Sequence, residues 1–213
     1  MAVIAITGRK GGIGKSTITG NLAAELTERG HSVRVLDTDP QQSLLAWARL
    51  GEGLLSRITE AVDTGHPKLF EIAVQKAAQA CDIVLIDTPP GFADPALISA
   101  LLADIVLLPA GPSPLDVMAA RDALELVREA KRKRGGRKPL IRFVPSRLIS
   151  RANLSHDLPQ SLRELGEEVL PGLTHRTVVA EATLSGLTVA EYAASSVARE
   201  EFLALAKAVE KLL

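Results

Sequence analysis

A glycine-rich loop directly after the first apolar run limits what this chain can fold into. The run over 2–7 (AVIAIT) predicts a buried strand, and the loop over 8–17 (GRKGGIGKST) leads into a helical pattern over 16–29. Glycines let successive backbone N–H groups converge on phosphate oxygens, and the helix start adds the positive end of its dipole. Strand, glycine loop and helix in this order therefore predict a phosphate-binding loop.

The side chains of this loop indicate the ligand. Lys15 is placed to reach the β- and γ-phosphates of a nucleoside triphosphate, and the Ser16 hydroxyl is placed to bind a Mg²⁺ ion that bridges phosphate oxygens. A plain glycine turn is disfavoured, because these specific residues lie between a predicted strand and a predicted helix. The predicted nucleotide-binding residues are Gly11, Gly12, Ile13, Gly14, Lys15, Ser16 and Thr17.

Apolar runs alternate with helical patterns along the rest of the chain. With 46% hydrophobic residues the chain can bury a core, and its 213 residues suit one domain over 1–213 without an evident linker. The alternation predicts an α/β fold with a doubly wound, mostly parallel sheet and helices on both faces. The predicted strands are 2–7, 32–37, 82–87, 104–109 and 140–145, and the predicted helices are 16–29, 42–50, 67–80, 94–102, 114–134, 155–166 and 199–212.

An acid ends the third apolar run. Four hydrophobic residues followed by Asp87 form a Walker B arrangement, in which the carboxylate binds a Mg²⁺-bound water or the Ser16 hydroxyl. The second run ends in Asp37, and Asp39 follows it, so both acids are expected to face the nucleotide from the carboxyl end of a strand. For Asp37, a direct role beside the metal and a structural role as a turn former both remain open.

The phosphate loop departs from the ordinary Walker A pattern in a way that resembles one family. The first glycine of GxxxxGK[ST] would fall at Arg9, and an additional lysine, Lys10, precedes the glycines. The string KGGIGKST (10–17) matches the deviant Walker A motif of the ParA/MinD ATPases. Three further strings are similar to that family: DTDPQQ (37–42), DTPPG (87–91) and PSPLD (112–116), of which the last resembles short, plasmid-type (ParF-like) ParA proteins.

The resemblance implies a P-loop NTPase with a deviant Walker A motif, with ATP and Mg²⁺ as cofactors. Lys10 would join the nucleotide-binding set by reaching the phosphates of a partner subunit, and Asp39 would orient the attacking water. The implied catalytic residues are thus Lys10, Lys15 and Asp39, and the implied metal residues are Ser16, Asp39 and Asp87. Loops over 174–186 would lie near the adenine and the dimer interface, and Ser146-Arg147 stands where the family often has Asn after the fifth strand.

ATP is expected rather than GTP. A guanine-reading motif of the NKxD type needs an asparagine before a lysine, and neither Asn21 nor Asn153 precedes one. The resemblance further implies an ATP-dependent homodimer that binds double-stranded DNA without sequence preference. Hydrolysis stimulated by a ParB-like or other cargo adaptor would release it, so that the protein partitions or positions a cargo such as a plasmid or chromosome.

The charges of the chain are balanced overall but segregated. Lys plus Arg and Asp plus Glu both number 25, whereas 128–142 hold eight basic residues and one acid. This segment is either a solvated helix end or a DNA-binding surface. A charge run alone favours the solvated helix end, and the resemblance raises the DNA-binding interpretation to about equal weight. The DNA-binding candidates are Lys131, Arg132, Lys133, Arg134, Arg137 and Lys138, with Arg151 and Arg176 added by resemblance.

Two other functions remain as alternatives: a MinD-like positioning ATPase on a membrane, and a metabolic P-loop ligase resembling dethiobiotin synthetase. The last predicted helix places Phe202, Leu205, Ala206, Val209 and Leu213 on one stripe, and its mixed charges favour packing on the core over membrane attachment. With one cysteine, Cys81, and no charged segment before the first apolar run, we expect the cytoplasm. Association with the nucleoid is implied by the resemblance.

Overall fold

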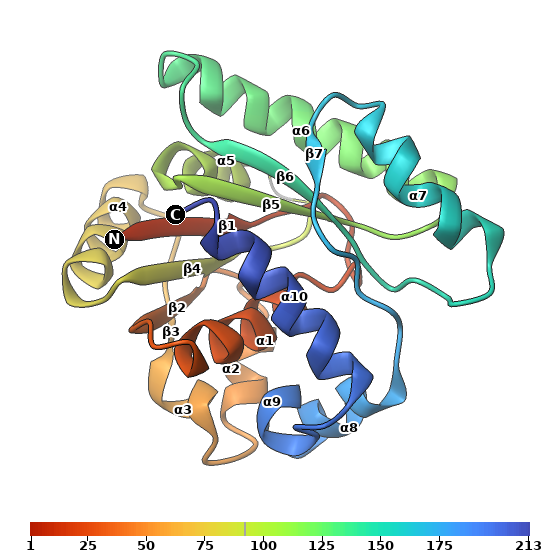
Figure 1. The fold of residues 1–213 in the computed structure, drawn as a ribbon. Helices are drawn as coiled ribbons and strands as arrows, with labels where there is room; N and C mark the ends of the chain where they lie inside the picture. Colours follow the sequence, from red (N-terminus) through yellow and green to blue (C-terminus); the bar gives the residue numbers. More distant parts are fainter. Residues whose placement is uncertain (92) are drawn as a thin grey trace.

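Seven parallel strands form one sheet in the computed structural model, which describes residues 1–91 and 93–213 (Figure 1). Their order is β3-β2-β4-β1-β5-β6-β7, so β1, which leads into the glycine loop, lies at the centre. The doubly wound α/β fold is confirmed, and all neighbouring strands of the described chain pair in parallel. The strands are β1 (Ala2–Ile6), β2 (Val33–Asp37), β3 (Thr59–Ala61), β4 (Ile83–Asp87), β5 (Ile105–Ala110), β6 (Leu140–Pro145) and β7 (Glu168–Val169).

Helices cover both faces of the sheet (Figure 1). One face carries α1 (Lys15–Glu28), α2 (Ser43–Ala48), α3 (Leu54–Ile58), α8 (Thr177–Leu184), α9 (Val189–Tyr192) and α10 (Val197–Glu210). The other face carries α4 (Pro67–Ala80), α5 (Ala93–Leu102), α6 (Pro114–Lys133) and α7 (Asn153–Arg163).

The two apolar layers explain why the strands read as continuous apolar runs. In β4, Ile83 and Leu85 pack with the α1 side, whereas Val84 and Ile86 pack with the α6 side. All four side chains are buried, because successive residues of a strand point to opposite faces and both faces are covered.

The predicted strands and helices are found within three residues at each end. Five further elements were not predicted: α3, β3, β7, α8 and α9. Each has eight residues or fewer, which is too short for a clear hydrophobic period.

The last helix packs on the core as expected, with one correction. Phe202, Leu205, Ala206 and Val209 are buried against the α1 side. Leu213, which was expected on the same stripe, lies beyond the end of α10 at Glu210 and is 50% exposed. Within the described ranges, we find no helix with both the length and the apolarity to cross a membrane.

A close backbone contact joins the α2–α3 segment to the α8–α9 segment. Gly186 has φ +67°, and a Cβ added there would lie 2.2 Å from the backbone nitrogen of Gly51. Nearby, Trp47 Nε1 donates a hydrogen bond of 3.2 Å to the carbonyl oxygen of Leu187. Only glycine satisfies both the positive φ and the close approach at position 186.

Gly186→Ala is therefore expected to destabilise the protein by at least about 3 kcal/mol, or to prevent folding, because steric overlap adds to backbone strain. Gly30→Ala is the matched control, since Gly30 has φ +96° but open space around the added Cβ. It should cost only about 1 kcal/mol. Urea unfolding of both variants measures the difference, and equal losses of stability would contradict the packing contact.

Candidate phosphate-binding site

The glycine loop between β1 and α1 leaves backbone donors free for an anion. Gly12 and Gly14 adopt positive φ values of 72° and 90°, and Gly14 caps α1 without a side-chain hydrogen bond. The first helical bond runs from the Ile18 amide to the Gly14 carbonyl oxygen, at 2.8 Å. The amides at the start of α1 therefore have no partner within the helix and suit phosphate oxygens.

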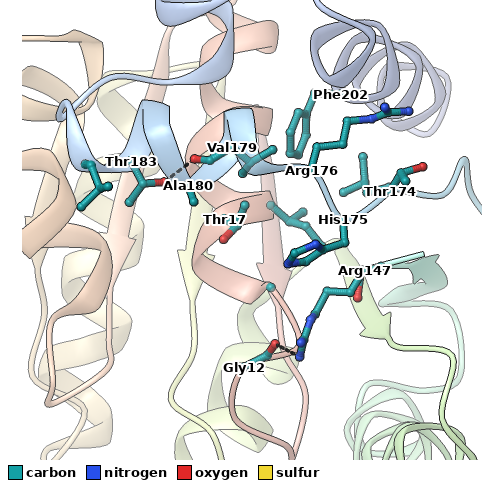
Figure 2. Close-up of a pocket in the computed structure, with 15 residues that line it drawn as sticks. Gly12, Thr17, Arg147, Thr174, His175, Arg176, Val179, Ala180, Thr183 and Phe202 are labelled. Carbon is teal, nitrogen blue, oxygen red and sulfur yellow. Dashed lines mark hydrogen bonds between the residues drawn. The ribbon is translucent and has the colours of Figure 1, made fainter. Parts of the chain in front are cut away.

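Two residues after β6 hold the outer side of this loop. The Ser146 hydroxyl donates to the Ile13 carbonyl oxygen at 2.8 Å. Arg147 Nη1 donates to the Gly12 carbonyl oxygen at 2.9 Å, as Figure 2 shows. Arg147 adopts a left-handed φ of 54°, which is uncommon for a side chain of this size. These loop-holding contacts were not predicted, because they join residues more than 130 positions apart.

Lys15 lies between the loop and two carboxylates. Its side chain is buried, and its Nζ is 3.5 Å from the Lys10 carbonyl oxygen. Burial lowers the pKa of Lys15, while the charges of Asp87 and Asp39 act in the opposite direction. The structure thus brings Lys15, Asp39 and Asp87 together at the carboxyl ends of β1, β2 and β4, as the sequence predicts.

Asp87 is a buried acid, and one of its carboxylate oxygens lacks a hydrogen-bond partner among the described residues. Burial raises its pKa to about 7, and hydrogen bonding from Ser16 opposes this. Thr19 Oγ1 donates to Oδ1 at 3.3 Å, whereas Oδ2 is buried and finds no hydrogen-bond partner in the described part of the chain. An unsatisfied carboxylate oxygen beside a serine hydroxyl fits a hard cation such as Mg²⁺, so the donor set of Ser16 and Asp87 agrees with the predicted metal residues.

Asp37 is a loop-holding residue. It lies in register with Asp87 on the neighbouring strand, and burial raises its pKa. Its carboxylate accepts the amides of Asp39 (3.1 Å) and Leu45 (2.9 Å), which ties the loop after β2 to α2. Of the two roles left open by the sequence, the structure favours that of a turn former.

Asp39 lies on the loop that Asp37 holds. Its side chain is half-buried, and its Oδ1 accepts the Gln41 amide at 2.9 Å. The charge of Asp39 acts against the burial that lowers the pKa of Lys15, so the two side chains lie within electrostatic reach of each other. This position suits either a metal ligand through water or a group that orients a water molecule.

Lys10 does not point into the phosphate loop of its own chain. Its Nζ lies 2.5 Å from Asp116 Oδ1, near the start of α6. Of the eight predicted nucleotide-binding residues, Lys10 is therefore the one whose side chain leaves the loop, while the others form it. Asp116 was not predicted as a partner, since it follows 106 residues later.

A cavity of about 680 Å³ opens beside the glycine loop. Figure 2 shows Arg147 and His175 at one side of it and the helix α8 at the other. Its walls are largely apolar, and among the described lining residues there is no carboxylate. The lining residues are Gly12, Gly14, Thr17, Ile18, Ser146, Arg147, Leu173, Thr174, His175, Arg176, Val179, Ala180, Thr183, Leu184 and Phe202.

The predicted DNA-binding residues do not form one surface. Residues 131–138 lie where α6 ends, at the amino ends of the strands and opposite the phosphate loop, whereas Arg151 follows the carboxyl end of β6 and Arg176 follows that of β7. Because α6 has 20 residues, the two ends of this helix are about 30 Å apart. Arg176 also pairs with Glu201 at 2.7 Å, so its charge is partly neutralised.

Several basic residues of the 128–142 segment have partners. Lys133 pairs with Glu129 (2.7 Å), Lys138 pairs with Asp104 (2.6 Å), and Arg134 donates to the Ala103 carbonyl oxygen. For Lys131, Arg132 and Arg137, the described residues supply no ion pair. These three side chains are the cations of the segment that stay most available to a polyanion.

The sequence of the chain is similar to a known family of nucleotide-binding domains. A profile of the CobQ/CobB/MinD/ParA nucleotide binding domain matches residues 4–189. The chain is 30% identical over 195 residues to "Maintenance of carboxysome distribution protein A" of Halothiobacillus neapolitanus, covering 87% of this chain and 85% of that protein. It is 32% identical over 182 residues to "Protein ParA" of Rhizobium radiobacter, covering 83% and 80%.

The fold also matches solved structures. The septum site-determining protein MinD of Pyrococcus horikoshii, in complex with Mg-ADP, superposes with a TM-score of 0.79 at 21% identity, over 99% of this chain and 96% of that one. At this identity the likeness shows the fold, which agrees with the strand order described above.

The raised pKa of Asp87 makes the stability of the ligand-free protein depend on pH. Below the ordinary aspartate value of 3.8 the acid is protonated in both the folded and unfolded chain. Between 3.8 and about 7 only the unfolded chain releases the proton, so stability falls as pH rises and the loss is complete above about 7. The full loss is as much as about 4 kcal/mol.

Asp87→Asn removes this titration. At pH 8, without nucleotide or Mg²⁺, the variant should be more stable than the wild type by about 2–4 kcal/mol, and the difference should disappear near pH 4. Urea unfolding at several pH values measures it, with the exposed Asp157→Asn as the control. Equal stability of Asp87→Asn and wild type at pH 8 would show that the buried carboxylate carries no penalty.

Proposed function

The chain belongs to the CobQ/CobB/MinD/ParA nucleotide-binding family, and on this premise we propose that it is a Mg²⁺-dependent ATPase of the ParA type that positions or partitions a cargo. The observation that carries the proposal is the convergence of the phosphate loop with Asp39 and Asp87 at three adjacent strand ends. A loop that binds phosphates, a buried acid that suits a metal and a second acid nearby are the parts that phosphoryl transfer to water requires.

The cavity beside the loop holds the nucleobase. Its apolar walls suit a flat ring, and its position beside Gly12 and Thr17 continues the path of the phosphates. Guanine presents two adjacent N–H donors that a carboxylate would satisfy, and the described lining supplies none. Adenine is therefore the base that this cavity fits, in agreement with the Mg-ADP bound by the MinD of P. horikoshii.

Different residues of the site bind the phosphates, hold the metal and orient the attacking water. Lys15 and the amides at the start of α1 bind the β- and γ-phosphates, while Ser16 and Asp87 hold the metal. When bound, Mg²⁺ neutralises charge that develops on the phosphate oxygens during transfer. Asp39 orients the attacking water from the loop that Asp37 fixes.

Lys10 supplies a cation to the phosphates of a partner subunit in an ATP-bound homodimer. Its Nζ lies against Asp116, outside the phosphate loop of its own chain, so this side chain is not one of the groups that form that loop. A cation supplied by a second subunit acts like an arginine finger, which stabilises the charge of the transition state.

The family includes both positioning ATPases and metabolic synthases, so the choice between them needs further support. Curated relatives with at least 30% identity to this chain include a carboxysome distribution protein and a ParA protein. The unpaired basic side chains at the end of α6 have no role in a metabolic ligase, whereas they suit a DNA surface. A membrane role is less well supported, because α10 uses its apolar face on the core.

These residue roles together give a cycle of ATP binding, DNA binding and release. ATP drives dimerisation, the dimer binds double-stranded DNA through its basic side chains without reading its bases, and hydrolysis stimulated by a cargo adaptor releases it. Since α6 separates the basic residues from the phosphate loop, the nucleotide controls DNA binding through dimerisation, which doubles the number of phosphate contacts.

Asp39→Ala is expected to reduce ATP hydrolysis by about 100-fold while it leaves ATP binding within about threefold of the wild type. The reason is that Asp39 orients water, whereas Lys15 and the loop amides bind the phosphates. Phosphate release in the presence of DNA and the binding of a fluorescent ATP analogue measure the two properties. Asp63→Ala, which removes an exposed acid from a different loop, is the control. Unaltered hydrolysis in Asp39→Ala would exclude this role.

Lys131→Glu/Arg132→Glu should lower the affinity for DNA by at least tenfold and flatten its dependence on salt, with nucleotide binding unchanged. Lys68→Glu/Lys76→Glu carries the same change of charge on exposed positions of α4 and should have little effect. Co-sedimentation with DNA and with liposomes, with ATP against ADP, provides the readout. Pelleting with liposomes and not with DNA would instead support the membrane alternative.

A further inference from the structure

The side chain of Lys10 already has an anionic partner in its own chain. Its Nζ lies 2.5 Å from Asp116 Oδ1, with the Lys10 side chain 44% exposed and the Asp116 side chain 13% exposed. An ion pair between a largely buried acid and a half-exposed lysine is more favourable than one between two fully exposed side chains. Lys10 is therefore held at the start of α6 in this state of the protein.

The position of Asp116 does not depend on Lys10. Asp116 is the third residue of α6, and it forms a capping box with Ser113: its amide donates to Ser113 Oγ (3.1 Å), and its Oδ2 accepts the Ser113 amide (3.4 Å). Gly111 leaves room for this carboxylate, since a Cβ added at position 111 would lie 2.5 Å from Asp116 Oδ2. Three local features thus fix one oxygen on the helix cap and present the other to Lys10.

The same geometry lets Lys10 leave at a moderate cost. After its departure Asp116 retains the Ser113 amide, the positive end of the α6 dipole and exposure to solvent on one side. Lys10 in turn exchanges one anion for another. The pair can therefore open without leaving a buried charge uncompensated.

We propose that Asp116 is a positioning residue that holds Lys10 within its own subunit and so opposes dimerisation until a nucleotide is bound, an inference that rests on the proposed function. Lys10 has to give up its 2.5 Å contact with Asp116 if its ammonium group is to extend to a phosphate of the partner subunit. Nucleotide phosphates and Asp116 compete for the same cation. The equilibrium between monomer and dimer is then shifted by the difference between the two contacts.

A neighbouring ion pair supplies a matched control. Arg9, the residue before Lys10, pairs with Asp122 on the same helix at 3.8 Å, and both side chains are more than half exposed. Asp122→Asn removes the same charge from α6 and has no contact with Lys10. Asp116→Asn keeps the helix cap, because the side-chain oxygen of Asn still accepts the Ser113 amide.

The experiment compares wild type, Asp116→Asn and Asp122→Asn as full chains, with Mg²⁺ and the non-hydrolysable analogue AMPPNP. We expect the dimer dissociation constant of Asp116→Asn, measured by analytical ultracentrifugation, to fall about fivefold relative to wild type, with Asp122→Asn unchanged. A second readout uses the nucleotide-free monomer: acetylation of Lys10 by acetic anhydride, followed by mass spectrometry, should be faster in Asp116→Asn only.

The outcomes separate this proposal from the function on which it rests. A tighter dimer together with a more reactive Lys10 supports it, since damage to the fold would weaken the dimer instead. If the wild type dimerises and Asp116→Asn dimerises equally well or more weakly, Asp116 does not oppose dimerisation and the proposal is overturned alone. If the wild type does not dimerise with AMPPNP, the proposed function fails and the proposal fails with it.

Discussion

The buried charges at the carboxyl ends of β1, β2 and β4 are the constraint on which the rest of the site depends. Asp37 and Asp87 are register partners on adjacent strands, and burial raises the pKa of both. Two backbone amides satisfy Asp37, whereas Asp87 keeps an oxygen without a partner in the described chain. The protein thus retains a carboxylate oxygen without a hydrogen-bond partner in the described core, which is unfavourable for folding. Such an oxygen suits a site in which a bound ligand supplies the missing partner.

The satisfied acid links this site to the rest of the molecule. By holding two amides, Asp37 connects the loop of Asp39 to α2. From α2, the indole of Trp47 contacts Leu187, and the backbone beyond α2 packs on Gly186. The segment around Gly186 follows α8, which forms a wall of the cavity beside the phosphate loop. A continuous series of packed contacts therefore connects the loop of Asp39 to α8, the helix that forms a wall of the cavity.

Local patterns explain which of these features could be predicted. The central strands are covered on both faces, so each appears in the sequence as a continuous apolar run, whereas β3 and β7 have three and two residues and leave no such signal. The loop and Asp87 belong to local motifs. The contacts of Lys10 with Asp116 and of Ser146 with Ile13 join distant residues, and no local pattern encodes them. The basic segment likewise looked uniform, because acids such as Asp104 approach it only in the fold.

The length of α6 has a consequence for how two anions can occupy this protein together. Its 20 residues separate Asp116 and the phosphate loop from the basic side chains by about 30 Å. At physiological ionic strength the Debye length is about 8 Å, so charges at the two ends are screened from each other. A nucleotide and a polyanion would then bind without mutual repulsion. Any influence of one on the other must be transmitted mechanically or through assembly, which gives the protein two electrostatically independent surfaces.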